Sequence, residues 1–116
     1  MTKLAHLIAT QEGFYVAGSV PNRNNNMGDL RHSPHSQHPG DPNGIGVIDT
    51  VEHGWEDLER QLQLYAQRGM NLRQCIEEYA PPSENNTEAY LDFVLNGFGG
   101  QVDQESLLTQ VLEIQA

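Results

Sequence analysis

Glu12 is the first residue in this chain whose position suggests chemistry. It ends a stretch whose apolar residues fall at helical spacing, and Gly13 then provides a natural helix stop. A carboxylate at the C-terminal end of a helix meets the negative end of the macrodipole, and the neighbours Phe14 and Tyr15 favour a partly desolvated setting. Both effects raise the pKa of a carboxyl group, as a general acid at neutral pH requires. The alternative is a solvated carboxylate at a helix end.

An asparagine-rich segment, RNNNMGDLR, spans residues 23–31. The side-chain amides of Asn24, Asn25 and Asn26 donate and accept hydrogen bonds at once, which suits sugar hydroxyls and N-acetyl groups. The two flanking arginines pair with the chain's own acids or with a ligand carboxylate. The alternative is a series of asparagine-closed turns in a surface loop.

Three histidines, His32, His35 and His38, follow at intervals of three residues. Three imidazoles can bind zinc and leave a position open for water. However, Pro34 and Pro39 disfavour a helix that would bring the three rings to one face, and the HExxH arrangement is absent. We therefore expect solvated loop histidines and no metal or other cofactor.

A tyrosine further along the chain is a candidate partner for the acid. Tyr90 lies in a helical pattern that begins near Thr87, and its place in the pattern directs it inward. A buried tyrosine hydroxyl must find a hydrogen-bond partner. A carboxylate such as that of Glu12 would serve.

Composition limits the classes of partner. The chain has 116 residues, which we interpret as one domain over 1–116, and its 16 acidic against 6 basic residues give a net charge of −10. Such a charge disfavours binding to nucleic acid and to anionic lipid. No apolar run of about 18 residues predicts a membrane span, and no signal-peptide pattern is present, so we expect synthesis in a cytoplasm. The single cysteine, Cys75, lies at helical spacing among apolar residues and predicts a buried structural thiol.

The periodicity predicts a mainly helical domain with a long loop over residues 14–44 and one short strand or hairpin at 44–50. In the longest helix, Asp57 falls on the polar side, opposite the apolar stripe that contains Trp55, Leu58 and Leu62. The expected helices are 3–12, 51–68, 72–79, 88–98 and 106–114.

Four pieces of the chain, in this order, resemble segments of the lysozyme superfamily. They are QEG at 11–13, RNNNMGDLR at 23–31, GIGVIDT at 44–50 and ENNTEAYLDFVL at 84–95. The resemblance covers most of residues 4–98 and is to small phage-associated peptidoglycan-cleaving proteins related to lytic transglycosylases and muramidases. Met27 and Asp29 stand where this family more commonly has proline and asparagine.

This resemblance implies an α+β lysozyme-like fold with a cleft for a peptidoglycan glycan strand. Glu12 would protonate the glycosidic oxygen of a MurNAc–GlcNAc link, and Tyr90 would orient Glu12. The implied substrate contacts are Asn24, Asn25, Asn26, Asp29, Arg31, Asp49 and Thr50.

The number of catalytic carboxylates separates two reactions. An ordinary hydrolase needs a second carboxylate, for which Asp29, Asp41 and Asp49 are the candidates. A lytic transglycosylase needs only one, because the C6 hydroxyl of MurNAc closes a 1,6-anhydro ring. Since no phage-lysozyme spacing of Glu, Asp and Thr follows Glu12, the sequence favours the single-carboxylate reaction.

The resemblance implies a phage or prophage origin, with action at the cell wall or a place in the virion. Two alternatives stay open. One is a lysozyme-like module without activity, which acts as a binding module or as a structural part of the virion in contact with other virion proteins. The strong acidity and the altered loop favour this alternative. The other is a zinc-binding protein that uses His32, His35 and His38.

Overall fold

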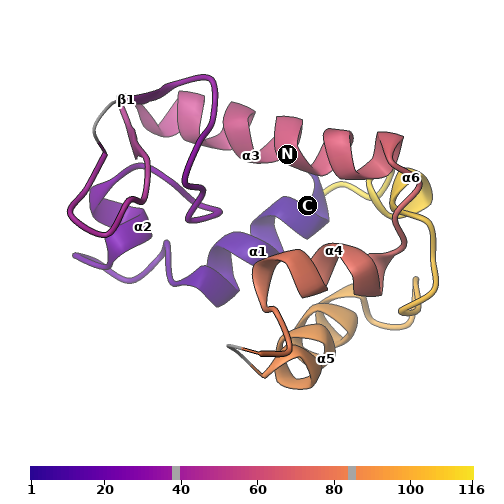
Figure 1. Cartoon of the computed structure of the whole chain (residues 1–116). Coiled ribbons are helices and arrows are strands. Elements are labelled where there is room, and N and C mark those ends of the chain that lie inside the picture. The colour runs from indigo at the N-terminus through magenta and orange to yellow at the C-terminus, as the bar shows by residue number, and fades with distance from the viewer. Residues whose placement is uncertain (38–39, 84–85) are drawn as a thin grey trace.

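The computed structural model describes residues 1–37, 40–83 and 86–116, and within these ranges it has six helices and a two-stranded antiparallel sheet (Figure 1). The prediction of a mainly helical chain with a minor sheet is therefore confirmed. The elements are α1 (Lys3–Glu12), α2 (Val20–Arg23), β1 (Ser36–Gln37), β2 (Val47–Ile48), α3 (Val51–Gln67), α4 (Leu72–Tyr79), α5 (Thr87–Phe98) and α6 (Leu108–Val111).

Helix α1 begins and ends as its sequence predicts. The Thr2 hydroxyl accepts a hydrogen bond from the Ala5 N–H at 3.2 Å and so caps the first turn. Gly13 takes a left-handed conformation (φ +91°) and ends the helix, a conformation that glycine adopts without the steric penalty of a Cβ. Glu12 is consequently the last helical residue.

The next three long helices begin at side-chain caps. Thr50 accepts from the third residue of α3, and Asn71 forms a capping box with Gln74 at the start of α4. Asn86 caps α5, so that Thr87 is the first residue of that helix rather than the residue ahead of it. These caps place the three helix starts within one residue of the sequence prediction.

Two elements differ from the prediction. The long loop contains α2, which Ser19 caps and in which Pro21 occupies an early helical position, a recognised helix-start signature. The last helix is only Leu108–Val111, because Leu107 has an extended backbone (φ −65°, ψ 138°) and forms a β-bridge with Asn71. Pairing with another segment thus replaces the first helical turn that the periodicity indicated.

The sheet is shorter than the predicted strand region. Only Val47–Ile48 is extended within residues 44–50, and it pairs with Ser36–Gln37, so that Ser36 lies opposite Ile48. The sheet and α2 lie together at one end of the molecule, and α4 and α5 lie at the other (Figure 1). Helix α3 runs along both.

One hydrophobic cluster joins the long helices. It includes fully buried side chains from α1, α3, α4 and α5 and the loop residue Met27. Cys75 is among them, and burial raises the pKa of its thiol to about 12, so the prediction of a buried cysteine is confirmed. The radius of gyration of 13.5 Å matches the roughly 13 Å expected of a compact chain of this length.

Asp57 is buried, and its predicted place on the solvent side of α3 is wrong. Its side chain is 1 % exposed. One carboxylate oxygen accepts from the Ser33 hydroxyl at 2.5 Å and from the His35 N–H at 2.9 Å, and the other lies 2.6 Å from the His35 Nδ1. The loop that follows residue 30 is therefore fastened to α3 by the buried Asp57 carboxylate, both oxygens of which have hydrogen-bond partners.

Within the described ranges, none of the helices combines the length and the apolar character needed to cross a lipid bilayer.

Gly54 is where α3 touches the asparagine-rich loop most closely. A Cβ at this position would lie 2.1 Å from the Asn25 carbonyl oxygen and 2.7 Å from the Met27 sulfur. Gly54→Ala should therefore destabilise the chain by about 3 kcal/mol in denaturant unfolding, although alanine normally favours a helix over glycine by up to about 1 kcal/mol. Gly100→Ala is the matched control, because φ there is +87° and the space is open, so its cost should stay near 1 kcal/mol. A neutral or stabilising Gly54→Ala would contradict this packing.

Candidate functional site

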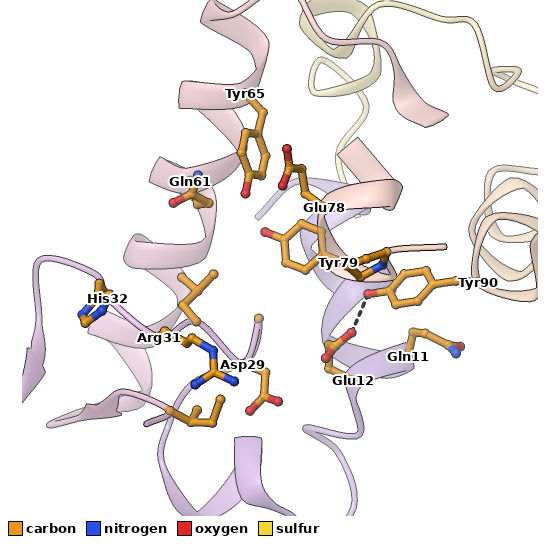
Figure 2. A pocket seen from close by; sticks show the side chains of 14 residues that line it. Gln11, Glu12, Asp29, Arg31, His32, Gln61, Tyr65, Glu78, Tyr79 and Tyr90 are labelled. Carbon is orange, nitrogen blue, oxygen red and sulfur yellow. Dashed lines mark hydrogen bonds between the residues drawn. The ribbon is translucent and has the colours of Figure 1, made fainter. Parts of the chain in front are cut away.

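A pocket of about 710 Å³ lies where the end of α1 meets five other segments (Figure 2). These are the loop at residues 28–32, the loop at Ile45, the middle of α3, the end of α4 with the following Pro81, and the start of α5. The volume is that of a small-ligand site. The lining residues are Gln11, Glu12, Gly28, Asp29, Leu30, Arg31, His32, Ile45, Gln61, Tyr65, Glu78, Tyr79, Pro81 and Tyr90.

Glu12 and Tyr90 meet at one side of this pocket. The Tyr90 hydroxyl donates a hydrogen bond to the Glu12 Oε2 at 2.9 Å, across 78 residues of sequence (Figure 2). Burial raises the pKa of Glu12 to about 7, the hydrogen bond from Tyr90 opposes that rise, and the nearby Asp29 charge adds to it. At neutral pH the carboxyl group is thus near half protonation, with a hydroxyl that fixes its orientation.

The cause of this raised pKa differs in part from the predicted one. Tyr15 does not shield the acid, because its side chain is 52 % exposed and its hydroxyl lies 2.9 Å from the His6 Nδ1. Phe14 packs edge-on against Trp55. The surroundings of Glu12 are instead residues far away in the sequence.

Asp29 lies across the pocket from Glu12 (Figure 2). Its backbone is left-handed (φ +53°), a conformation that aspartate adopts more readily than most residues. Burial and the charge of Asp41 raise its pKa, and Arg31 opposes the rise. Its Oδ1 is buried and forms no hydrogen bond within the described part of the chain. A second carboxylate with an unused acceptor therefore faces the acid.

Tyr65 and Tyr79 form an aromatic wall that the sequence analysis missed. Their rings meet edge-to-face with centroids 6.3 Å apart. The Tyr79 hydroxyl is buried, points into the pocket in Figure 2 and has no hydrogen-bond partner among the described residues. The sequence did carry a signal, because Tyr79 is the last residue before the Ala-Pro-Pro break that ends α4, and a tyrosine at such an edge is partly buried with a polar tip to satisfy.

The three asparagines predicted to contact substrate are used inside the loop, and none lines the pocket. The Asn24 amide donates to Asp41 at 3.0 Å, and the Asn25 amide donates to the Ile48 carbonyl at 3.0 Å. The Asn26 amide donates to the carbonyls of Leu30 and Gly46, and its oxygen accepts from the Leu30 N–H. Their observed role is to hold the loop that carries Asp29.

Asp49 and Thr50 lie away from the pocket at the start of α3. Both are exposed, Thr50 as the helix cap and Asp49 with its carboxylate 2.7 Å from the His53 Nδ1. Asp41 is likewise occupied, because it accepts from the backbone N–H groups of residues 43 and 45 as well as from Asn24. Of the three predicted candidates for a second carboxylate, only Asp29 lines the pocket with Glu12.

Arg31 is also in the pocket, where one of its guanidinium N–H groups donates to the Asn43 carbonyl at 2.9 Å. Arg23 donates to the Gly18 carbonyl at 2.5 Å. Within the described residues, no ion pair joins either arginine to Glu12. The acid is therefore held by a neutral donor, which leaves its proton available.

The predicted histidine cluster is divided. His32 lines the pocket, His35 lies against α3, and His38 lies outside the described residues. A different group contains three potential metal ligands, namely His35, His53 and Glu56.

Comparison with protein-family models, curated proteins and solved structures found no match. What the site can do is therefore argued from its own residues. A half-protonated carboxyl group oriented by a tyrosine, opposite a second carboxylate and beside a cation and two aromatic rings, can transfer a proton to a polar ligand held in the pocket.

The pKa of Glu12 should move in opposite directions when its two neighbours are changed. Tyr90→Phe removes the hydrogen bond that stabilises the carboxylate and should raise the pKa above about 7. Asp29→Asn removes a negative charge and should lower it. Carbon-detected NMR titration of the labelled glutamate carboxyl groups measures both. Shifts in the same direction, or a wild-type value near 4.5, would contradict the site described.

The raised pKa also predicts how stability depends on pH. The folded chain keeps the Glu12 proton up to about pH 7, whereas the unfolded chain loses it near 4.5. The stabilisation from this proton is therefore fully present below pH 4.5 and is lost as pH rises towards 7. Glu12→Gln removes the titration, so its free energy of unfolding relative to wild type should rise by up to about 3 kcal/mol between pH 4.5 and 8. A constant difference across that range in urea unfolding would rule out the shift.

Proposed function

We propose that this chain cleaves the glycan strands of bacterial peptidoglycan at the MurNAc–GlcNAc bond, with Glu12 as general acid. The observation that carries the proposal is the Tyr90–Glu12 hydrogen bond within a pocket where the pKa of Glu12 is about 7. Cleavage of a glycosidic bond needs an acid that is still protonated near neutral pH.

The pocket lining supports a sugar as the ligand. Amides, carboxylates and tyrosine hydroxyls line the pocket together with the rings of the tyrosines, so that polar and apolar faces of a saccharide would both find partners. Two of these polar groups, the Asp29 Oδ1 and the Tyr79 hydroxyl, have no hydrogen-bond partner in the described chain. Buried groups of this kind need a partner, and sugar hydroxyls would supply one.

Peptidoglycan as the particular glycan is supported by the resemblance to the lysozyme superfamily. The segment with Glu12, the loop with Asp29 and Arg31, and the helix with Tyr90 are three of the four pieces that carry this resemblance, and all three contribute to one pocket. The fourth piece, at 44–50, contributes Ile45 but neither Asp49 nor Thr50. Arg31 is suited to the lactyl and peptide carboxylates of the cell wall. We propose the lysozyme-like cleft on the same grounds.

In the proposed reaction Glu12 gives its proton to the glycosidic oxygen as the bond to C1 of MurNAc breaks, which leaves a free hydroxyl on GlcNAc. The Glu12 carboxylate then takes a proton from the group that attacks C1. That group is the C6 hydroxyl of the same MurNAc in a transglycosylase, which forms the 1,6-anhydro ring, and water in a hydrolase. Asp29 is the second carboxylate that the hydrolytic route would use. No cofactor is needed in either route.

The proposed setting is a phage or prophage, with action on the cell wall from the virion or at lysis. The second candidate is a lysozyme-like module without activity that binds cell wall or other virion proteins. The net charge of −10 disfavours capture of the acidic peptides of peptidoglycan, and so favours the form of this candidate that binds other virion proteins.

Loss of the acid should abolish cleavage. Purified protein should reduce the turbidity of isolated cell wall, and Glu12→Gln should lower that rate at least a hundredfold. Glu105→Gln, an exposed carboxylate outside the pocket, is the matched control and should retain the wild-type rate.

The masses of the released fragments identify the route, because anhydro products arise from the C6 hydroxyl and reducing ends arise from water. No cleavage by the wild-type chain, or equal cleavage by wild type and Glu12→Gln, would overturn the proposal. Binding to cell wall without cleavage would support the inactive module.

A further inference from the structure

A second group of chemically active side chains lies outside the pocket. His35, from the loop after residue 31, meets His53 and Glu56, from the first turns of α3, and one potential ligand atom of each lies within 4.8 Å of the others. His53 and Glu56 are three residues apart and so share a face of the helix. Segments remote in sequence therefore supply two imidazoles and a carboxylate to one place.

The hydrogen bonds of the two histidines define which ring nitrogen remains for a ligand. The Nδ1 of His35 lies 2.6 Å from an oxygen of Asp57, and the Nδ1 of His53 lies 2.7 Å from an oxygen of Asp49. An ionised carboxylate only accepts, so each Nδ1 carries the proton. In a neutral ring, the Nε2 then offers a lone pair. Histidines that bind metals are held by this kind of carboxylate partner.

The geometry is partly fixed before any ion binds. Asp57 is fully buried and holds both the ring and the backbone N–H of His35. The rings of His35 and His53 stack with centroids 3.8 Å apart and planes within 7°. A ring nitrogen binds a metal ion through the lone pair that lies in the plane of its ring, so the half-exposed His53 ring must turn out of this stack before both rings can bind one ion.

We propose that His35, His53 and Glu56 bind a divalent transition-metal ion, with Zn²⁺ the best match. Two imidazoles and one carboxylate form a donor set typical of zinc sites that keep an open position. Ligand bonds of 2.0–2.1 Å would place neighbouring donor atoms roughly 3.4 Å apart, so the donor atoms, now within 4.8 Å of one another, must approach by up to about 1.4 Å, and the exposed Glu56 and the half-exposed His53 have room to move. The net charge of −10 raises the local concentration of cations.

The bound ion would fasten the loop to α3 beside the pocket. His35 follows Arg31 and His32, both of which line the pocket, by only a few residues. Zinc would thus add a link between that pocket wall and the helix that carries Gln61 and Tyr65. This site departs from the sequence-based expectation that no metal is bound, and it holds whether or not the chain cleaves glycans.

Calorimetric titration of untagged, chelator-treated protein with Zn²⁺ tests the site. We expect one ion per chain and a higher melting temperature in its presence. His53→Gln and Glu56→Gln should each raise the Zn²⁺ dissociation constant at least tenfold. Asp49→Asn, which frees His53, should raise it ten- to a hundredfold. His6→Gln is the matched control, because His6 lies outside the cluster, and it should bind as wild type does.

Three results would overturn the inference. One is no Zn²⁺ binding by the wild-type chain at 100-fold molar excess. Another is equal affinity in wild type, His53→Gln and Glu56→Gln, which would assign the heat to scattered surface carboxylates. Displacement of Zn²⁺ by an equal concentration of Ca²⁺ would likewise contradict a site built on imidazoles. Far-ultraviolet circular dichroism of each variant verifies its fold.

Discussion

The close packing of α1 against α5 is the constraint on which the site depends. Gly97 on α5 faces Leu7 on α1 so closely that a Cβ there would lie 2.4 Å from a Leu7 methyl group. This approach brings the Tyr90 hydroxyl within hydrogen-bond distance of Glu12 and removes water from around the carboxyl group. The same contact therefore raises the pKa of the acid and fixes its direction, so that fold stability and acid strength are linked.

Much of the polar character of the chain serves the framework of the pocket rather than its ligand. The asparagine amides hold the loop from within, and the buried Asp57 carboxylate fastens the next loop segment to α3. Asp29 and Arg31 are left as the charged loop residues that face Glu12 (Figure 2). A rigid loop of this kind can present a charge to a buried acid at a constant distance, which is what a reproducible pKa requires.

The sequence predicted those features that local chemistry determines. Caps at the starts, glycines after α1 and α3, and prolines after α4 placed the ends of these helices. The pairing of Tyr90 with a carboxylate was anticipated because a buried hydroxyl needs a partner. It could not show that Asp57 turns inward, because the hydroxyl and imidazole that satisfy it come from residues 33 and 35. For the same reason His35 was grouped with its sequence neighbours, whereas its ring stacks on that of His53. Such long-range partners leave no periodic signal.

The most direct test of the central claim compares two titrations of one group. Above neutral pH, kcat/KM for cleavage of soluble peptidoglycan fragments should fall, with a midpoint equal to the pKa of Glu12 measured by NMR in the free protein, about 7. Agreement of the two midpoints in wild type, and their joint displacement in Tyr90→Phe, is the expected result. A rate that stays constant or rises through the NMR midpoint would contradict Glu12 as the acid.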